Sequence, residues 1–195
     1  MSEPENQNSA DTRQKIARAA LGTFAELGFQ GASTREISRR AGVNQGLITY
    51  YFKSKEALWR EAANVAFQEF REILGPLQTA VTQLSAQQAK RLLLREFALF
   101  LGRRPELVRF MIGDGKRPAE RVDWLVETHL SEFYQGVNLF SKEPEQRAHE
   151  FYAFIGAAAV MFAVPDECIR LTGIDPNTER SIALHADLVT DLFVS

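Results

Sequence analysis

Apolar residues recur at intervals of three and four positions along most of the chain, and no stretch of any length alternates strictly between apolar and polar residues. Such spacing places the apolar side chains on one face of an α-helix, whereas a half-buried strand requires alternation. The pattern therefore predicts an all-α protein without internal repeats. Helices are expected over about residues 12–27, 54–74, 85–101, 105–111, 118–137, 145–171 and 177–193, with two shorter ones between residues 33 and 52.

Glycine and proline divide these helices. Gly28 is expected to stop the first helix, and the pair Gly75-Pro76 to break or kink the helix that begins near residue 54. Pro165 is expected to bend the long helix near the C-terminus, and the stretch from Gly113 to Gly115 to form a loop. Residues 1–11 are polar, slightly acidic and unlike a signal peptide, so they are expected to form a disordered tail.

The most informative segment follows the first helix. Ser33 is placed to cap a short helix, and Gly42 to end it in a left-handed conformation. Asn44 is placed to cap a second short helix, in which apolar residues recur one turn apart on the inner face. The second helix turns small and hydrogen-bonding residues outward. Two helices joined in this way are typical of a helix-turn-helix DNA-binding motif, here over residues 33–52.

Charge is unevenly distributed along the chain. The whole chain has a formal net charge of −2, but the segment from Thr12 to Arg60 holds nine Lys and Arg against three Glu, a local charge of +6. Phosphate binding depends on where basic side chains cluster rather than on the overall balance. The cluster therefore favours DNA as a partner over the alternative, which is the solvated surface of a helical domain.

No other chemistry is supported by the sequence. The single cysteine, Cys168, excludes an internal disulfide, fits a reducing cytoplasm and is interpreted as a small buried hydrophobe. The stretch from Gly113 to Lys116 lacks the full spacing of a phosphate-binding loop, and the apolar run from Phe151 to Val164 is too short to span a membrane. The histidines are far apart and have no metal-like spacing: His129, His149 and His185. We therefore expect no enzyme, no catalytic residue, no metal, no cofactor and no membrane partner.

The stretch TRQKIARAALGTFAELGFQGASTREISRRAGVNQGLITYYFKSKEALW, about a quarter of the chain, carries the signposts of a known family. They are Ala19-Ala20, Phe24, Gly28-Phe29, Ile37, Ala41-Gly42-Val43, Gly46, Tyr51-Phe52, Lys55 and Leu58. On these residues the chain resembles the TetR family of bacterial transcription regulators. Asn44, Gln45, Leu47 and Thr49 depart from residues common in that family. The resemblance implies a DNA-binding domain over residues 12–58 and a helical effector-binding and dimerisation domain over residues 59–195.

The resemblance also implies which residues meet DNA. Gln45 and Thr49 are expected to read bases, and Tyr50, Tyr51 and Lys55 to contact phosphates. For Tyr51 the alternative is packing against its neighbour in sequence and the first helix. The full predicted DNA-binding set is Ser33, Thr34, Arg35, Asn44, Gln45, Gly46, Thr49, Tyr50, Tyr51 and Lys55.

Two further roles are predicted for the C-terminal part. A small-molecule effector of unknown identity is expected among its helices, and the alternative for each pocket residue is ordinary core packing. The predicted pocket residues are Phe97, Arg109, Phe110, Met111, Trp124, His129, Phe133, Phe151 and Phe162. Residues 154–160 are apolar nearly all round, which fits either a core helix or a homodimer interface. The predicted interface residues are Phe154, Ala158, Phe162, Ile182, Ala186, Val189 and Phe193.

The sequence thus predicts a cytoplasmic, dimeric, all-α regulator that binds an inverted-repeat operator in double-stranded DNA. A repressor released by a small ligand is favoured within that class, with an activator or a protein-responsive regulator as the nearest alternatives. From another class, the alternative is a helical effector-binding or structural module whose basic head contacts a membrane or an acidic protein.

Overall fold

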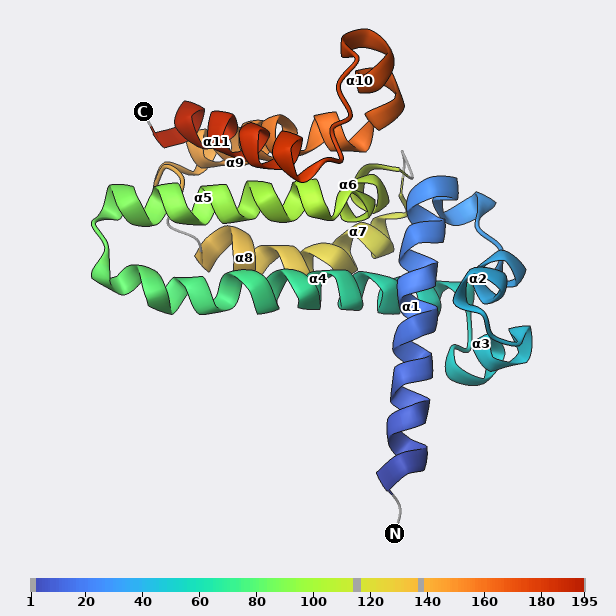
Figure 1. Ribbon diagram of the computed structural model, residues 1–195. Coiled ribbons are helices and arrows are strands. Elements are labelled where there is room, and N and C mark those ends of the chain that lie inside the picture. Colours follow the sequence, from blue (N-terminus) through green and yellow to red (C-terminus); the bar gives the residue numbers. More distant parts are fainter. Residues whose placement is uncertain (1–2, 114–116, 137–138, 195) are drawn as a thin grey trace. The chain divides into compact units, whose positions relative to one another are not determined.

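The structure is a computed structural model that describes residues 3–113, 117–136 and 139–194. Every regular element within these ranges is helical, as Figure 1 shows, which confirms the predicted all-α fold. The described chain divides into two compact units. The first contains the residues up to Phe70 together with residues 106–113, and the second contains residues 71–105 and those described beyond Gly115.

The first unit is built on α1 (Glu3–Gly31), α2 (Thr34–Ala41), α3 (Gln45–Tyr51) and the N-terminal part of α4 (Lys55–Ala80). The short helix α6 (Pro105–Ile112) completes it. Its core combines one apolar face from each element, so that the outer faces of α2 and α3 are left to solvent. The buried side chains are Ile16, Ala20, Phe24, Ile37, Ala41, Ile48, Phe52, Leu58, Trp59, Ala62 and Phe110.

Two boundaries in this unit differ from the prediction. The helix α1 begins at Glu3, so residues 3–11 are helical rather than a disordered tail, and the Ser9 hydroxyl lies 3.1 Å from that of Tyr51. Met1 and Ser2 lie outside the described residues. The unit also runs to Phe70 rather than to residue 58, because α4 keeps an apolar face buried well beyond Leu58. Gly28 interrupts α1 as predicted, with φ at 66°.

Pro76 does not end α4, which continues to Ala80 and is followed by the 3-10 turn η1 (Val81–Gln83). A proline removes one N–H from the helical hydrogen bonds and crowds the preceding turn, but a helix can pass it when the flanking turns hold. The predicted end of this helix near residue 74 is therefore wrong, because α4 continues through Gly75-Pro76 to Ala80.

The second unit contains α5 (Ala86–Arg103), α7 (Ala119–Leu125), α8 (Ser131–Gly136), α9 (Pro144–Ala163), α10 (Pro165–Thr172) and α11 (Glu179–Val194). A π-helical turn, η2 (Val126–Leu130), joins α7 to α8. Figure 1 shows α11 and α9 running along α5. The predicted helix ended at Val137, and the predicted loop reached Asp114 and Gly115; these three residues lie outside the described ones.

The predicted long helix from residue 145 to 171 is two helices. The residue before a proline is disfavoured in the helical region, and Val164 accordingly takes φ −123° and ψ 57° before Pro165. As a result α9 and α10 meet at 76°. No single helix in the described chain is long and apolar enough to cross a membrane, although this bent pair together meets the length and composition required.

Candidate nucleic-acid interface

The helix-turn-helix is fixed by local hydrogen bonds that the sequence predicts. The Ser33 hydroxyl accepts a hydrogen bond from the backbone N–H of Glu36 at 3.1 Å and so caps α2. Gly42 ends α2 with φ 61° and ψ 38°, the left-handed conformation that a glycine adopts without strain. The Asn44 side chain then accepts from the N–H of Gly46 at 2.8 Å and caps α3. These three caps define where α2 begins and ends and where α3 begins.

The outer surface of α3 presents hydrogen-bonding side chains. Gln45 and Thr49 are exposed, and Ile48 between them is buried, so the helix anchors itself on one side and offers polar groups on the other. The Gln45 amide nitrogen donates to the Thr34 hydroxyl at 3.2 Å, which joins the first turn of α3 to that of α2. The structure thus brings Gln45, one of the two predicted base readers, together with Thr34, another member of the predicted DNA-binding set.

Tyr50 and Tyr51 have different surroundings although they are adjacent. Tyr50 is 78% exposed, whereas Tyr51 is half-buried and its hydroxyl meets Ser9. The Tyr51 ring contacts Tyr50 at 5.0 Å and Phe52 at 6.4 Å between centroids. Packing, which the sequence left open as an alternative for Tyr51, is therefore observed.

Lys55 also makes contacts within the unit. Its Nζ donates to the backbone oxygen of Gln30 at 3.3 Å and lies 4.7 Å from the centre of the Phe29 ring. Both contacts tie the start of α4 to the end of α1. A phosphate contact by Lys55, as predicted from the sequence, would have to share the ammonium group with these partners.

Acidic residues neutralise several of the basic side chains near α2. The Glu36 carboxylate accepts from Arg39 at 2.7 and 2.9 Å and from Arg40 at 2.8 Å, and these bonds lower the pKa of Glu36 to about 2. Arg40 also donates to Glu26 at 2.7 Å, and this bond lowers the pKa of Glu26. The network links α1 to α2. Its two guanidinium groups, which contribute to the local charge of +6, are already paired with carboxylates.

Three other arginines pair with carboxylates of α4. They are Arg13 with Glu61, Arg18 with Glu69 and Arg60 with Glu56. Within the described residues, no ion pair is found for Lys15, Arg35 and Lys53, all of which are exposed. Arg35 belongs to the predicted set, whereas Lys53 does not. The position of Lys53, next to the C-cap residue of α3, was the signal in the sequence that could have added this lysine to the predicted set.

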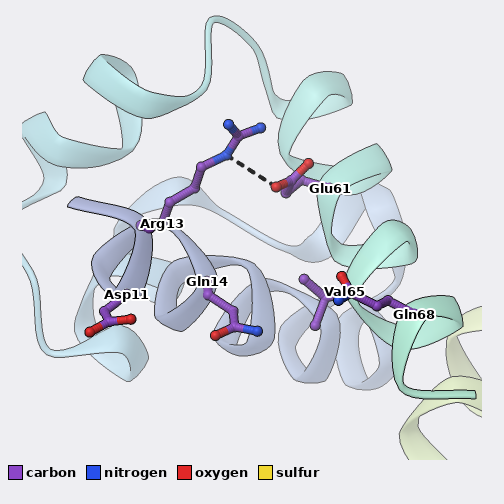
Figure 2. Close-up of a pocket in the computed structure, with 7 residues that line it drawn as sticks. Asp11, Arg13, Gln14, Glu61, Val65 and Gln68 are labelled. Carbon is purple, nitrogen blue, oxygen red and sulfur yellow. Dashed lines mark ion pairs between the residues drawn. The ribbon is translucent and has the colours of Figure 1, made fainter. Parts of the chain in front are cut away.

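A polar recess of about 360 Å³ lies between α1 and α4 in the same unit (Figure 2). Figure 2 shows the Arg13–Glu61 ion pair, with N and O 3.0 Å apart, beside Asp11, Gln14 and Gln68. Two carboxylates and one guanidinium give this recess no excess of positive charge. It therefore lacks the electrostatics of a phosphate site and is separate from the outer face of α3.

The predicted pocket residues fall in both units. Arg109, Phe110 and Met111 are on α6 in the first unit, where the Phe110 ring stacks on Trp59 with centroids 5.0 Å apart. Phe110 is thus a core residue of the first unit and not of the second. The others are Phe97, Trp124, His129, Phe133, Phe151 and Phe162, all in the second unit.

Within the second unit, aromatic rings connect most of these side chains. The Phe97 ring lies 5.2 Å from Phe133 and 5.3 Å from Phe154, and Phe133 lies 6.2 Å from Phe151. The ring of His129 lies 5.2 Å from that of Trp124. Among the described residues, no group of three His, Cys, Asp or Glu side chains is placed to hold a metal ion.

The predicted dimer interface needs a correction. Its residues pack inside a single chain, because α5, α9 and α11 contact one another and bury their apolar faces in these contacts. The Phe193 ring, for example, meets that of Phe154 at 5.4 Å within the chain. The residues buried in this way are Phe154, Ala158, Phe162, Ile182, Ala186 and Val189. They form the core of the body and present no surface to a second copy.

Three comparisons with known proteins relate the chain to one family. Residues 16–62 match the model of the bacterial regulatory proteins of the tetR family. The probable HTH-type transcriptional regulator YttP of Bacillus subtilis is 27% identical over 139 residues, 70% of this chain and 66% of YttP. The HTH-type transcriptional regulator RutR of Escherichia coli is 38% identical over 72 residues, 33% of this chain and 34% of RutR. The matches thus span just under two thirds of one relative and about a third of the other.

Solved structures agree on the fold over nearly the whole chain. The transcriptional regulator FadR from Bacillus subtilis, in complex with stearoyl-CoA, aligns with a TM-score of 0.64 over 93% of this chain and 97% of FadR, at 16% identity. The HlyIIR mutant protein aligns with a TM-score of 0.61 over 99% of this chain and 96% of that one, at 22% identity. The named relatives are regulators rather than enzymes, as the sequence predicted. The residues of the capped helix-turn-helix thus match the tetR family of bacterial regulatory proteins, and the chain as a whole shares its fold with solved regulators of this kind.

Proposed function

We propose that this protein is a transcriptional regulator that binds a specific double-stranded DNA sequence through α2 and α3. The observation that carries the proposal is the exposed side of these helices, where Gln45 is bonded to Thr34; the exposed cation Arg35 follows Thr34 in α2, and the exposed Lys53 follows the C-cap of α3. A glutamine amide can bond an adenine edge in the major groove, while arginine and lysine bind phosphates or guanine. Base reading and phosphate binding are therefore available on one surface.

The regulator is proposed to act as a homodimer on an inverted-repeat operator. One recognition helix reads only a few base pairs, so two heads on two half-sites are needed for specificity. The dimer surface is assigned to the exposed apolar side chains of α11 and α9 in place of the buried set. Leu184 and Leu188 are 59% and 56% exposed at a spacing of four residues, and Val160 on α9 is 57% exposed. Side chains of this size rarely stay in water on consecutive helical turns.

Within this proposal the C-terminal body binds a small molecule, and binding releases the protein from DNA. The protein is then a repressor that acts in the cytoplasm. The stearoyl-CoA held by FadR, a protein of the same fold, supports a ligand-binding body in general but not this ligand. Release requires that the ligand bind one arrangement of the dimer better than the other, since equal binding shifts nothing.

Selection of bound duplexes from a random library at about 150 mM salt tests the proposal. An inverted repeat with half-sites about one helical turn or more apart is expected. Enrichment of no sequence, with only salt-sensitive retention, would contradict it. In that case the basic head would serve a membrane or an acidic protein, and binding to anionic vesicles would be the next measurement.

Two variants then separate base reading from phosphate binding on the selected operator. Gln45→Ala should relax the preference at one operator position, by about 1–3 kcal/mol, and leave the salt dependence unchanged. Lys53→Ala should weaken all sequences alike and reduce the salt slope by about 1. Lys142→Ala, an exposed lysine of the body, is the matched control and should change neither. An unaltered preference in the Gln45 variant would remove this residue from the reading surface.

The same salt titration on Lys55→Ala tests its predicted phosphate contact. A smaller slope is expected if its ammonium group leaves Gln30 for DNA, whereas an unchanged slope with a lower melting temperature would assign Lys55 a structural role only.

A further inference from the structure

Two basic side chains of α2 share one carboxylate. The Glu36 carboxylate accepts two hydrogen bonds from Arg39, one on each oxygen, at 2.9 and 2.7 Å, and a third from Arg40 at 2.8 Å. A guanidinium binds a phosphate with the same two-bond geometry that Arg39 uses here. The hydrogen bonds from Arg39 and then Arg40 lower the pKa of Glu36 to about 2. The carboxylate is therefore ionised at neutral pH and occupies the donors that a phosphate would need.

The two arginines depend on Glu36 to different degrees. Arg40 also donates to Glu26 at 2.7 Å, so it keeps a carboxylate partner when Glu36 is removed. Among the described residues, Glu36 is the only ion-pair partner found for Arg39. The Arg39 side chain is 71% exposed, against 28% for that of Arg40. Removal of the charge on Glu36 therefore releases one guanidinium, that of Arg39, and leaves α2 linked to α1 through Arg40.

Arg39 shares a helix face with a member of the predicted DNA-binding set. Arg35 and Arg39 are four residues apart, which places them on one side of α2, and both are exposed. Arg35 follows Thr34, whose hydroxyl accepts from Gln45. An arginine without a carboxylate partner on this side of α2 is a natural phosphate ligand. The pairing with Glu36 withholds Arg39 from that role.

The Glu36 side chain is not used to cap its own helix. In α5 the side chain at the equivalent position, that of Gln88, accepts from the N–H of the capping residue Ser85 at 3.0 Å. Among the described hydrogen bonds, none joins the Glu36 carboxylate to the N–H of Ser33. The cap of α2 rests instead on the Ser33 hydroxyl and the backbone N–H of Glu36. Replacing the carboxylate by an amide therefore removes a counter-ion and keeps the cap.

We propose that Glu36 is an internal counter-ion that withholds Arg39 from DNA phosphates and so limits the sequence-independent part of DNA affinity. Phosphate contacts carry no sequence information directly, so withholding one leaves a larger share of operator binding to base contacts. The inference rests on the proposed function, because it concerns the same DNA-binding surface and specifies what restricts phosphate binding there.

A double-mutant cycle on a short labelled duplex of scrambled sequence tests the inference. The full-length variants are titrated by fluorescence anisotropy at several salt concentrations. Glu36→Gln should add one phosphate contact and steepen the salt slope by about 0.9, so that its advantage over the wild type falls roughly threefold between about 50 and 200 mM salt. Arg39→Gln should leave the slope of the wild type unchanged. In the Glu36→Gln background the same substitution should return the slope to the wild-type value, because it removes the added contact.

Additive effects would overturn the inference. If Arg39→Gln lowers the slope equally in both backgrounds, Arg39 reaches a phosphate whether or not Glu36 is present. An unchanged slope in Glu36→Gln has the same consequence. Glu69→Gln is the matched control, since it removes a carboxylate paired with Arg18 outside the helix-turn-helix, and it should keep the wild-type slope. An equal increase in this control would assign the effect to net charge alone.

Two further comparisons complete the test. Arg39→Gln retains both bonds of Arg40, so it decides the matter even if Glu36→Gln fails to fold, and a slope reduced by about 0.9 in this variant would refute the inference. Operator selection with the wild type keeps the two proposals apart. A specific operator with an additive cycle refutes only the role of Glu36, and a non-additive cycle without a specific operator refutes only the regulator function.

Discussion

At the scale of single residues, His129 is strongly altered by its surroundings. Its imidazole is buried beside a guanidinium, and burial is the larger cause of its low pKa. In an unfolded chain a histidine titrates near its ordinary value of about 6.5. Between that value and about 4 the unfolded chain therefore binds more protons than the folded one.

This difference predicts that the protein loses stability as pH falls from 7.5 to 5. Protonation of the unfolded chain favours unfolding over this range, and His129 should contribute roughly 1–2 kcal/mol of the loss. Urea unfolding at the two pH values measures it. His129→Gln should remove that part of the pH dependence, whereas His149→Gln, at an exposed position, should retain it. Identical pH dependence in the two variants would show that other groups are responsible.

At the scale of elements, the turn between α2 and α3 depends on one backbone conformation. Gly42 has φ 61°, and its N–H bonds the carbonyl oxygen of Arg39 at 3.2 Å. A side chain in this conformation is strained whatever space surrounds it. Gly22, in the middle of α1, is the opposite case, because an added Cβ there would meet no atom within 4 Å.

The two glycines should therefore respond oppositely to alanine. Gly42→Ala should destabilise the protein by about 1 kcal/mol and weaken operator binding, because it tilts α3. Gly22→Ala should stabilise it by about 0.5–1 kcal/mol through the helix preference of alanine. Thermal unfolding of both variants and operator titration provide the measurement. A neutral Gly42→Ala would mean that the turn can relax without moving the recognition helix.

The helix α11 illustrates how one element divides its surface. Its inner side is buried, and its edge toward α5 forms ion pairs, with Arg95 and Asp187 2.7 Å apart and Arg103 and Glu179 2.9 Å apart. Arg91 and Asp191 form a third pair of this kind. These pairs fix α11 along α5 and leave the side that carries Leu184 and Leu188 to solvent.

At the scale of the whole molecule, this apolar side predicts self-association. Leu188→Glu should convert a dimer into a monomer of the 22.0 kDa chain, because it places a charge in the proposed interface. Sedimentation velocity measures the mass, and operator binding should fall with it, since one head then meets one half-site. Leu84→Glu, at an exposed leucine of the same unit outside α9 and α11, is the control. A dimeric Leu188→Glu would place the interface elsewhere.

The sequence by itself determined the features that depend on neighbouring residues. The caps at Ser33 and Asn44, the left-handed Gly42 and the buried positions Ile48 and Phe52 all appear in the structure. Each follows from side-chain chemistry or periodicity within about one helical turn, so the family and the exposed face of α3 could be inferred without coordinates.

Only the tertiary structure decided which apolar faces meet and which charges remain free. Phe110 packs against Trp59, about fifty positions away, and Phe154 against Phe193, so each belongs to the core of its own unit. Likewise Lys55 meets the backbone of Gln30 while Lys53 stays exposed. Periodicity specifies that a face is apolar but not what covers it, and a count of charges cannot show which of them are already paired.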